Sequence, residues 1–156
     1  MFHQVSSSSD ASVSPSEEVR ESCSNFTSSR KLRVTLLSNE WGSTKGGLPT
    51  INRKLAIQLA KDGDVKVCMY LPYVSEKDRK AAADCGVNLL IAKEKPGNEP
   101  IDWLASIPSD HQMDVLIGHG VHLGKHVPHI KESHPKCKCV HVVHTDAEEL
   151  GMFKTY

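Results

Sequence analysis

The sequence lacks an excess of charge of either sign: 19 Lys and Arg residues balance 19 Asp and Glu residues, so the formal net charge is zero. A neutral chain gives no reason to expect nucleic acid or an anionic membrane as partner, although its nine histidines take up protons below about pH 6.5. No apolar run approaches the roughly 20 residues of a membrane span. The N-terminus also lacks the basic and apolar regions of a signal peptide. We therefore expect a cytoplasmic protein.

Cysteines are few and odd in number, because the chain has only five. An odd, scattered set argues against a disulfide framework. The closest pair is the "CKC" at 137–139, whereas zinc sites usually separate paired cysteines by two to four residues and add a second pair of ligands. Alternate residues of a strand share a face, so we expect Cys137 and Cys139 to be small buried hydrophobes.

Apolar residues are scarce in the first part of the chain. Residues 1–30 are rich in serine and cannot bury enough surface to offset the entropy of ordering, so we expect a disordered tail. The remaining length, with 38% hydrophobic residues overall, suffices for one domain with a core. We place that domain at residues 31–156.

Within 31–156, apolar runs alternate with helical patterns. Strands are expected at 32–39, 65–72, 87–93, 113–120 and 137–145, and helices at 47–63, 75–86, 99–108, after 120 and at 146–153. Strict alternation predicts an α/β fold: a Rossmann-like, doubly wound parallel sheet of about five or six strands with helices on both faces. In the first helix the expected buried stripe is Leu48, Ile51, Leu55 and Leu59.

Two adjacent glycines lie in the connection between the first expected strand and the first expected helix. Gly46 and Gly47 permit positive φ and carry no Cβ to block a ligand, and the amides of a helix N-terminus favour an anion. Pro49 is tolerated in the first turn. The segment therefore has the parts of an anion cradle. A tight turn that only packs helix on strand is the other interpretation, and geometry alone leaves both open.

Two other glycine-loop chemistries fit poorly. A dinucleotide fingerprint needs G-x-G-x-x-G, which "GSTKGG" does not supply. A partition-type ATPase loop needs a lysine where Thr50 stands, and without it the contact to the β- and γ-phosphates is lost. A degenerate ATPase is therefore the third choice.

The string Lys45-Gly46-Gly47-Leu48 resembles the donor-phosphate loop of retaining GT-B glycosyltransferases, the family-four group that includes glycogen synthase and sucrose-phosphate synthase. The fourth strand ends "DVLIGHGVHLG" (114–124), which is similar to that group's histidine motif and matches it at His119, His122 and Gly124. The fifth strand ends with His144 in a similar position.

This resemblance implies the N-terminal, acceptor-side half of a nucleotide-sugar-dependent enzyme that transfers a hexosyl group, with UDP- or ADP-glucose as the kind of donor. It implies His119 as the catalytic histidine that contacts the sugar, and a substrate site with Gly46, Gly47, Lys45, His122 and His144. No metal or other cofactor is implied. The donor-binding C-terminal domain is expected to be absent from this chain, which should then be inactive alone. The alternative is a non-catalytic, Rossmann-like module that binds sugars or phosphates or has a regulatory role.

Two residues beside the glycines have two interpretations each. Trp41 could stack on an acceptor ring or shield the base of the loop. Glu40 could accept a sugar hydroxyl or be a solvated surface acid.

The run "HGVHLGKHVPHIKESH" raises the question of a metal. His122 and His126 have the i, i+4 spacing of zinc helices, but no acidic base lies between them and Pro128 interrupts a helix. We expect one histidine in the cleft, His119, and a solvated run beyond it.

Overall fold

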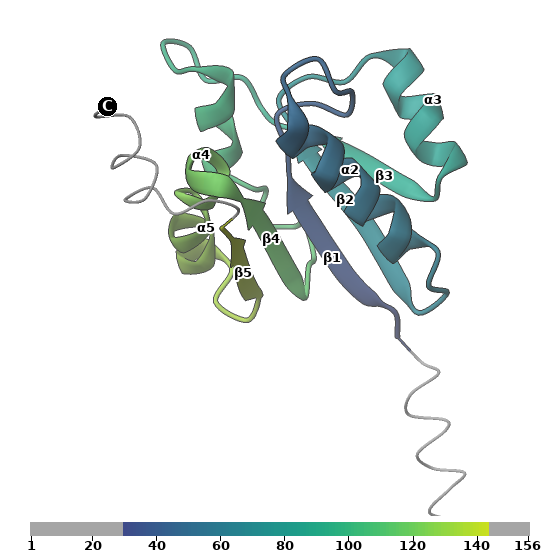
Figure 1. Ribbon diagram of the computed structural model, residues 1–156. Coiled ribbons are helices and arrows are strands. Elements are labelled where there is room, and N and C mark those ends of the chain that lie inside the picture. Colours follow the sequence, from purple (N-terminus) through teal and green to yellow (C-terminus); the bar gives the residue numbers. More distant parts are fainter. Residues whose placement is uncertain (1–29, 144–156) are drawn as a thin grey trace, which may run out of the picture. The chain divides into compact units, whose positions relative to one another are not determined.

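The computed structural model describes residues 30–143, which form a parallel sheet flanked by helices (Figure 1). The five strands follow the order β3-β2-β1-β4-β5, and every neighbouring pair is parallel. They are β1 (Leu32–Leu37), β2 (Val65–Leu71), β3 (Val87–Ile91), β4 (Val115–His119) and β5 (Lys138–Val142). The chain runs outward from β1 to β3 and then returns to β4 on the other side of β1. This confirms the predicted Rossmann-like fold and puts the topological switch point between β1 and β4.

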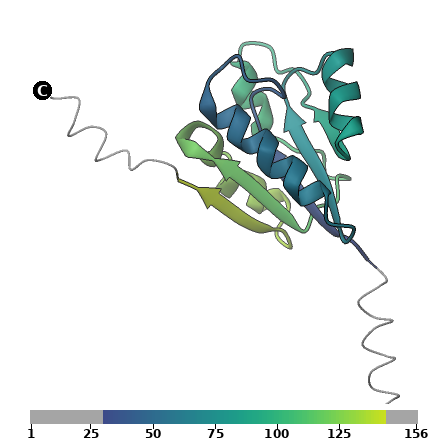
Figure 2. The ribbon, with the colours of Figure 1, turned by 45° about the vertical axis from the view of Figure 1, so that its right-hand side comes forward.

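Helices cover both faces of this sheet. One face carries α2 (Gly47–Ala60) and α3 (Glu76–Asp84), and we call it the α2 face. The opposite face carries the short 3₁₀ helix η1 (Pro100–Ala105), α4 (Gly120–Gly124) and α5 (Val127–Ser133), and we call it the α5 face. Figure 2 shows α2 lying along the sheet. The two hydrophobic cores are therefore separated by the strands.

Successive side chains of each strand point to opposite faces of the sheet, so each strand contributes residues to both cores. On the α2 face, strand pairing aligns the apolar rows Val34–Val67–Val87 and Leu36–Met69–Leu89. On the α5 face, near the carboxyl ends of the strands, Leu37, Tyr70 and Leu90 pack against Trp103 and Leu104 of η1. The Tyr70 hydroxyl donates to the carbonyl oxygen of Ser106 at 2.5 Å, which satisfies its polar tip.

The first helix buries a different stripe from the expected one. Leu48 and Ile51 are 39% and 46% exposed, while Leu55 and Leu59 are partly buried. The fully buried residues of α2 are Pro49, Asn52 and Ala56. The small residues let the helix approach the sheet closely, and a hydrogen bond from Asn52 to β1, described below, holds this rotation.

Other local predictions agree better with the structure. Ser75 caps α3 in a capping box with Asp78, and Gly86 ends the turn that follows with φ of 76°. The helix expected over 99–108 is the shorter 3₁₀ helix η1. The helix expected at 146–153, and the predicted tail apart from Arg30, lie outside the described residues, so the predicted domain boundaries stay predictions. Within the described part, no helix is both long and apolar enough to cross a membrane.

Candidate functional site

The glycine loop and His119 both lie at the switch point, at the carboxyl ends of β1 and β4. The loop leaves β1 at Ser38 and enters α2 at Gly47, while His119 is the last residue of β4 and the N-cap of α4. A Cβ placed on Gly120 would lie 3.2 Å from the Cδ1 of Leu48. The first turn of α2 therefore contacts the β4–α4 junction, which brings these sequence-predicted residues to one edge of the sheet.

The two glycines face open space. Gly46 is the N-cap of α2 with φ of 109° and ψ of −162°, a conformation that is essentially restricted to glycine. A Cβ on Gly46 or on Gly47 would meet no heavy atom within 4 Å. The first amides of a helix have no intrahelical acceptor, so the start of α2 has donors available for a ligand. The geometry has the features of the predicted anion cradle.

Glu40 organises the loop from within. Its carboxylate accepts a hydrogen bond from the Lys45 amide at 2.5 Å and another from the Thr44 hydroxyl. The Ser38 hydroxyl in turn donates to the Glu40 carbonyl oxygen at 2.8 Å. Neither expected role, sugar contact or simple solvation, anticipated these bonds. They engage the Lys45 amide, so a ligand would use the amides from Gly46 onward. The Lys45 side chain is exposed.

Trp41 lies below the loop rather than beside the open space. Its side chain is only 5% exposed and belongs to the core of the α2 face with Leu36 and Ala56. Arg53 of α2 donates to the Trp41 carbonyl oxygen at 3.4 Å. The indole therefore supports the base of the loop, which is the second of its two interpretations.

Asn52 is a site residue that the sequence analysis missed. Its Nδ2 donates to the carbonyl oxygen of Leu37, the last residue of β1, at 2.6 Å, and the residue is 1% exposed. Its Oδ1 is buried and makes no hydrogen bond to another described residue. The available signal was the spacing of Pro49, Asn52 and Ala56, which puts all three on one helical face. Asn52 thus ties α2 to the strand end from which the glycine loop departs.

The predicted histidines are placed differently from one another. His119 is 3% exposed, so its ring lies inside the edge of the sheet. His122 lies on the exposed surface of α4. His144 lies outside the described residues. The structure therefore places His119, with its ring buried, at the same edge of the sheet as the glycines, and leaves His122 at the surface.

Gly124 makes room for a fourth histidine that the sequence analysis did not single out. A Cβ on Gly124 would lie 1.9 Å from the Nε2 of His141 on β5. The same nitrogen is 2.8 Å from the Gly120 carbonyl oxygen. The hydrogen bond of the exposed His141 ring therefore links the start of α4, next to His119, to the edge strand β5. Gly118 also packs tightly, because a Cβ there would lie 2.7 Å from the Cγ2 of buried Val127.

The rest of the histidine run is dispersed. His126 is 7% exposed, and its Nε2 lies 3.7 Å from an oxygen of Asp102. Burial, aided by the neighbouring Lys125 charge, lowers the pKa of His126, with Asp102 opposing the shift. His129 is exposed and faces Glu132 at 3.8 Å. Within residues 30–143, no three His, Cys, Asp or Glu side chains gather closely enough to hold a metal ion.

The "CKC" cysteines pack against the core of the α5 face. Cys137 is 1% exposed and Cys139 is partly buried beside it. Burial raises the pKa of the Cys137 thiol to about 11. The prediction of small, buried, hydrophobic side chains holds for Cys137 and in part for Cys139.

Comparison with models of known protein families identifies a family for this chain. The profile of a family described as "Family 4 Glycosyltransferase in conflict systems" matches residues 35–156. Searches of curated proteins and of solved structures returned no match.

Proposed function

The chain belongs to the family-four glycosyltransferases of conflict systems, and on this premise we propose that its domain forms the acceptor-side wall of a retaining GT-B transferase. The proposed reaction moves a hexosyl group from a nucleotide sugar, such as UDP- or ADP-glucose, to a carbohydrate or small-molecule acceptor. The observation that carries this assignment is the glycine-started helix α2, which faces open space and contacts the β4–α4 junction beside His119.

The proposed roles follow from the charge that develops in the reaction. Cleavage of the donor leaves negative charge on a diphosphate, and fixed amide donors at a helix N-terminus stabilise such charge as it forms. In this proposal the amides at and after Gly46 would supply these donors. His119 would position the sugar through a hydrogen bond to a hydroxyl group. With the amides stabilising the diphosphate and His119 positioning the sugar, the proposed reaction needs no bound metal ion.

A second wall is needed to complete this site. The space over Gly46 and Gly47 is open, and Leu48, Ile51 and Val121 expose apolar surface near it, at 39%, 46% and 58%. A donor-binding domain that closes on this edge would exclude water and provide the remaining nucleotide contacts. We therefore expect the 156-residue chain alone to bind sugar ligands weakly and to show no turnover.

The test is a titration of the isotope-labelled chain with UDP-glucose, followed by amide resonances. We expect saturable shifts at Gly46, Gly47 and His119 at millimolar ligand. Gly63, which lies in the turn after the C-terminal end of α2 and also has open space around its Cβ position, is the internal control and should not shift. An unchanged spectrum at Gly46 and His119 would leave these residues a structural role only.

Binding without transfer is the second candidate, and Glu40 favours it. A carboxylate bonded to the Lys45 amide brings negative charge close to the cradle, which repels a diphosphate but accepts the hydroxyl groups of a neutral sugar. Free UDP and a glucan oligosaccharide separate the two candidates. Shifts with UDP support a transferase wall, whereas shifts with the oligosaccharide alone support a sugar-binding module.

A further inference from the structure

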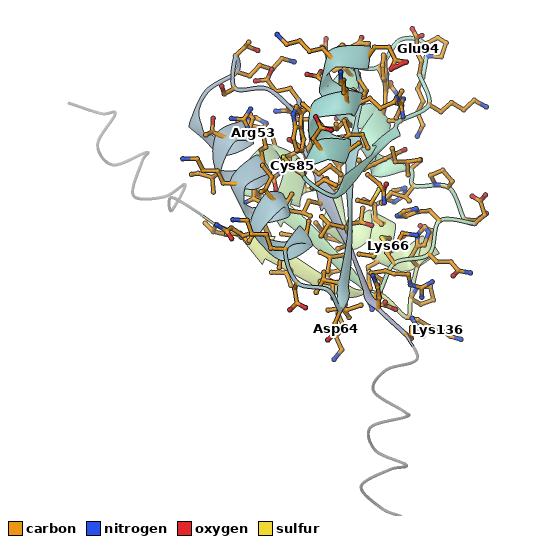
Figure 3. The ribbon with its side chains drawn as sticks, turned by 90° about the vertical axis from the view of Figure 1, so that its right-hand side faces the viewer. Arg53, Asp64, Lys66, Cys85, Glu94 and Lys136 are labelled. Carbon is orange, nitrogen blue, oxygen red and sulfur yellow. The ribbon has the colours of Figure 1, made fainter. Side chains whose placement is uncertain are left out.

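A cavity of about 610 Å³ opens on the α5 face at the amino ends of the strands, opposite the glycine loop. In Figure 3, Asp64 and Lys136, which precede β2 and β5, lie at the lower end of the domain, and Glu94, which follows β3, lies at the upper end. Lys66 lines the cavity from the lower half of this view, on the side of the strands opposite to Arg53 of α2. The size is within the usual range of small-molecule sites.

The floor of this cavity carries two polar side chains, Thr35 of β1 and Asn88 of the edge strand β3, with the Cys68 thiol between them. Strand pairing aligns Thr35 of β1, Cys68 of β2 and Asn88 of β3 in one row that faces the cavity. The neighbouring rows on the other face are Val34–Val67–Val87 and Leu36–Met69–Leu89. Strands covered by helices on both faces normally carry apolar side chains throughout. This row therefore carries fewer apolar side chains than the two rows on the other face.

No helix of the described chain covers this row. The helix between β3 and β4 is the six-residue η1, which packs on the apolar row of Leu37, Tyr70 and Leu90 toward the carboxyl ends. The chain then crosses to β4 through the cavity wall, which contains Pro108, Asp110, His111 and Gln112. The His111 Nε2 lies 2.9 Å from the Thr35 hydroxyl. The hollow is thus bounded by strands below and by a loop at one side.

Of the two basic side chains that line the cavity, Arg33 is paired and Lys66 makes no ion pair with a described residue, and the Asp110 carboxylate also belongs to the lining. Arg33 is held by Asp114, with a hydrogen bond from its Nη2 at 3.2 Å, and it also donates to Gln112. Lys66 is exposed, and no acidic side chain among residues 30–143 lies within ion-pair distance of it. The Asn88 side-chain amide is exposed and makes no hydrogen bond to another described residue. Burial, with nearby His134, lowers the pKa of His111, and the Asp110 charge opposes this shift.

We propose that this cavity is a second ligand site, for a small phosphate ester whose body carries hydroxyl groups, such as a sugar phosphate. The Lys66 ammonium group would bind the phosphate. Asn88 and His111 would donate to the body, and Asp110 would accept from its hydroxyls. Burial raises the pKa of Cys68 to about 11, so its thiol stays protonated and the site binds without covalent chemistry. This inference goes beyond the proposed transferase site, which lies at the other end of the sheet.

The test titrates the labelled full chain with ribose 5-phosphate, inorganic phosphate and ribose. We expect saturable shifts at Thr35, Cys68, Asn88 and His111 with ribose 5-phosphate, at least tenfold weaker binding of inorganic phosphate and no shift with ribose. Lys66→Met removes one charged hydrogen-bond donor and should weaken binding by about tenfold or more. Lys136→Met is the matched control, since Lys136 is also exposed at this end but lies outside the cavity. It should leave binding unchanged.

Several results would overturn the proposal. These are a flat titration with ribose 5-phosphate, equal affinity for inorganic phosphate, or equal losses in the Lys66 and Lys136 variants. Asn88→Leu provides a second check, because it removes the amide at an exposed position and should weaken binding while the melting temperature stays near that of the parent. Shifts confined to residues 39–47 would place the ligand at the glycine loop and also exclude the cavity. The failure of either site is thus distinguishable from failure of the other.

Discussion

The substitution Gly47→Ala separates the structural role of the glycine loop from its binding role. Gly47 is the first residue of α2, its φ is not positive, and an added Cβ would meet no heavy atom within 4 Å. Alanine restricts the unfolded chain and favours the helix, so we expect unfolding to cost about 0.5 kcal/mol more and the melting temperature to rise by about 2 °C. The same methyl group would enter the space that a donor phosphate occupies. We therefore expect UDP-glucose to bind at least tenfold more weakly, a loss of about 1.4 kcal/mol.

Two further alanine variants make this prediction specific. Gly46→Ala forces a side chain onto a φ of 109°, so it should lower the free energy of unfolding by about 1–3 kcal/mol. Gly63→Ala adds a methyl group in open space at the other end of α2 and should leave binding unchanged. Thermal melting and resonance titration measure the two effects separately. If Gly47→Ala binds UDP-glucose as well as the parent chain does, the ligand does not approach these amides and the cradle is refuted.

Three other predictions follow from buried contacts. Asn52→Ala should lower the free energy of unfolding in urea by about 1–3 kcal/mol, because the Leu37 carbonyl oxygen loses its hydrogen-bond donor. Asn52→Asp should lower it further, because this substitution buries a negative charge against that oxygen. Equal losses of stability in the two variants would contradict this prediction. Burial lowers the pKa of His126, so stability should fall as pH drops below 6.5 toward the folded-state pKa, and His126→Gln should flatten that pH profile. Gly118→Ala should destabilise the protein more than Gly124→Ala does, although the closest contact of the added Cβ is longer at Gly118 than at Gly124. The reason is that the Cβ at position 118 would meet a buried valine, whereas the exposed histidine ring that faces Gly124 can rotate away. A reversed order of the two melting temperatures would refute this prediction.

The fold followed from local patterns. Apolar runs alternating with helical periodicity predicted the strands of the parallel sheet, and the boundaries differ from the observed ones by a few residues. Ser75 and Gly86 marked the ends of α3 because capping and left-handed turns depend on neighbours within a few residues. The glycine loop was found for the same reason, since its conformation is restricted by the residues themselves.

The rotation of α2 was predicted less well. Its leucines and isoleucine formed a plausible stripe, yet Leu48 and Ile51 remain exposed while Asn52 and Ala56 face the sheet. Hydrophobic periodicity does not register a hydrogen bond between an amide and a strand end 15 positions away. The hydrogen bond from the Lys45 amide to Glu40 was not predicted for a similar reason, because an acidic residue in a polar loop does not indicate which backbone amide it will bind.

What the sequence determined by itself, then, was the succession of strands and helices and the glycine-rich entry to α2, because each depends on residues close together in the chain. Only the tertiary structure decided which side chains meet. Strand register aligned Thr35, Cys68 and Asn88, and helix docking brought Leu48 against Gly120. These contacts join residues tens of positions apart, and their partners are selected by packing of the whole sheet.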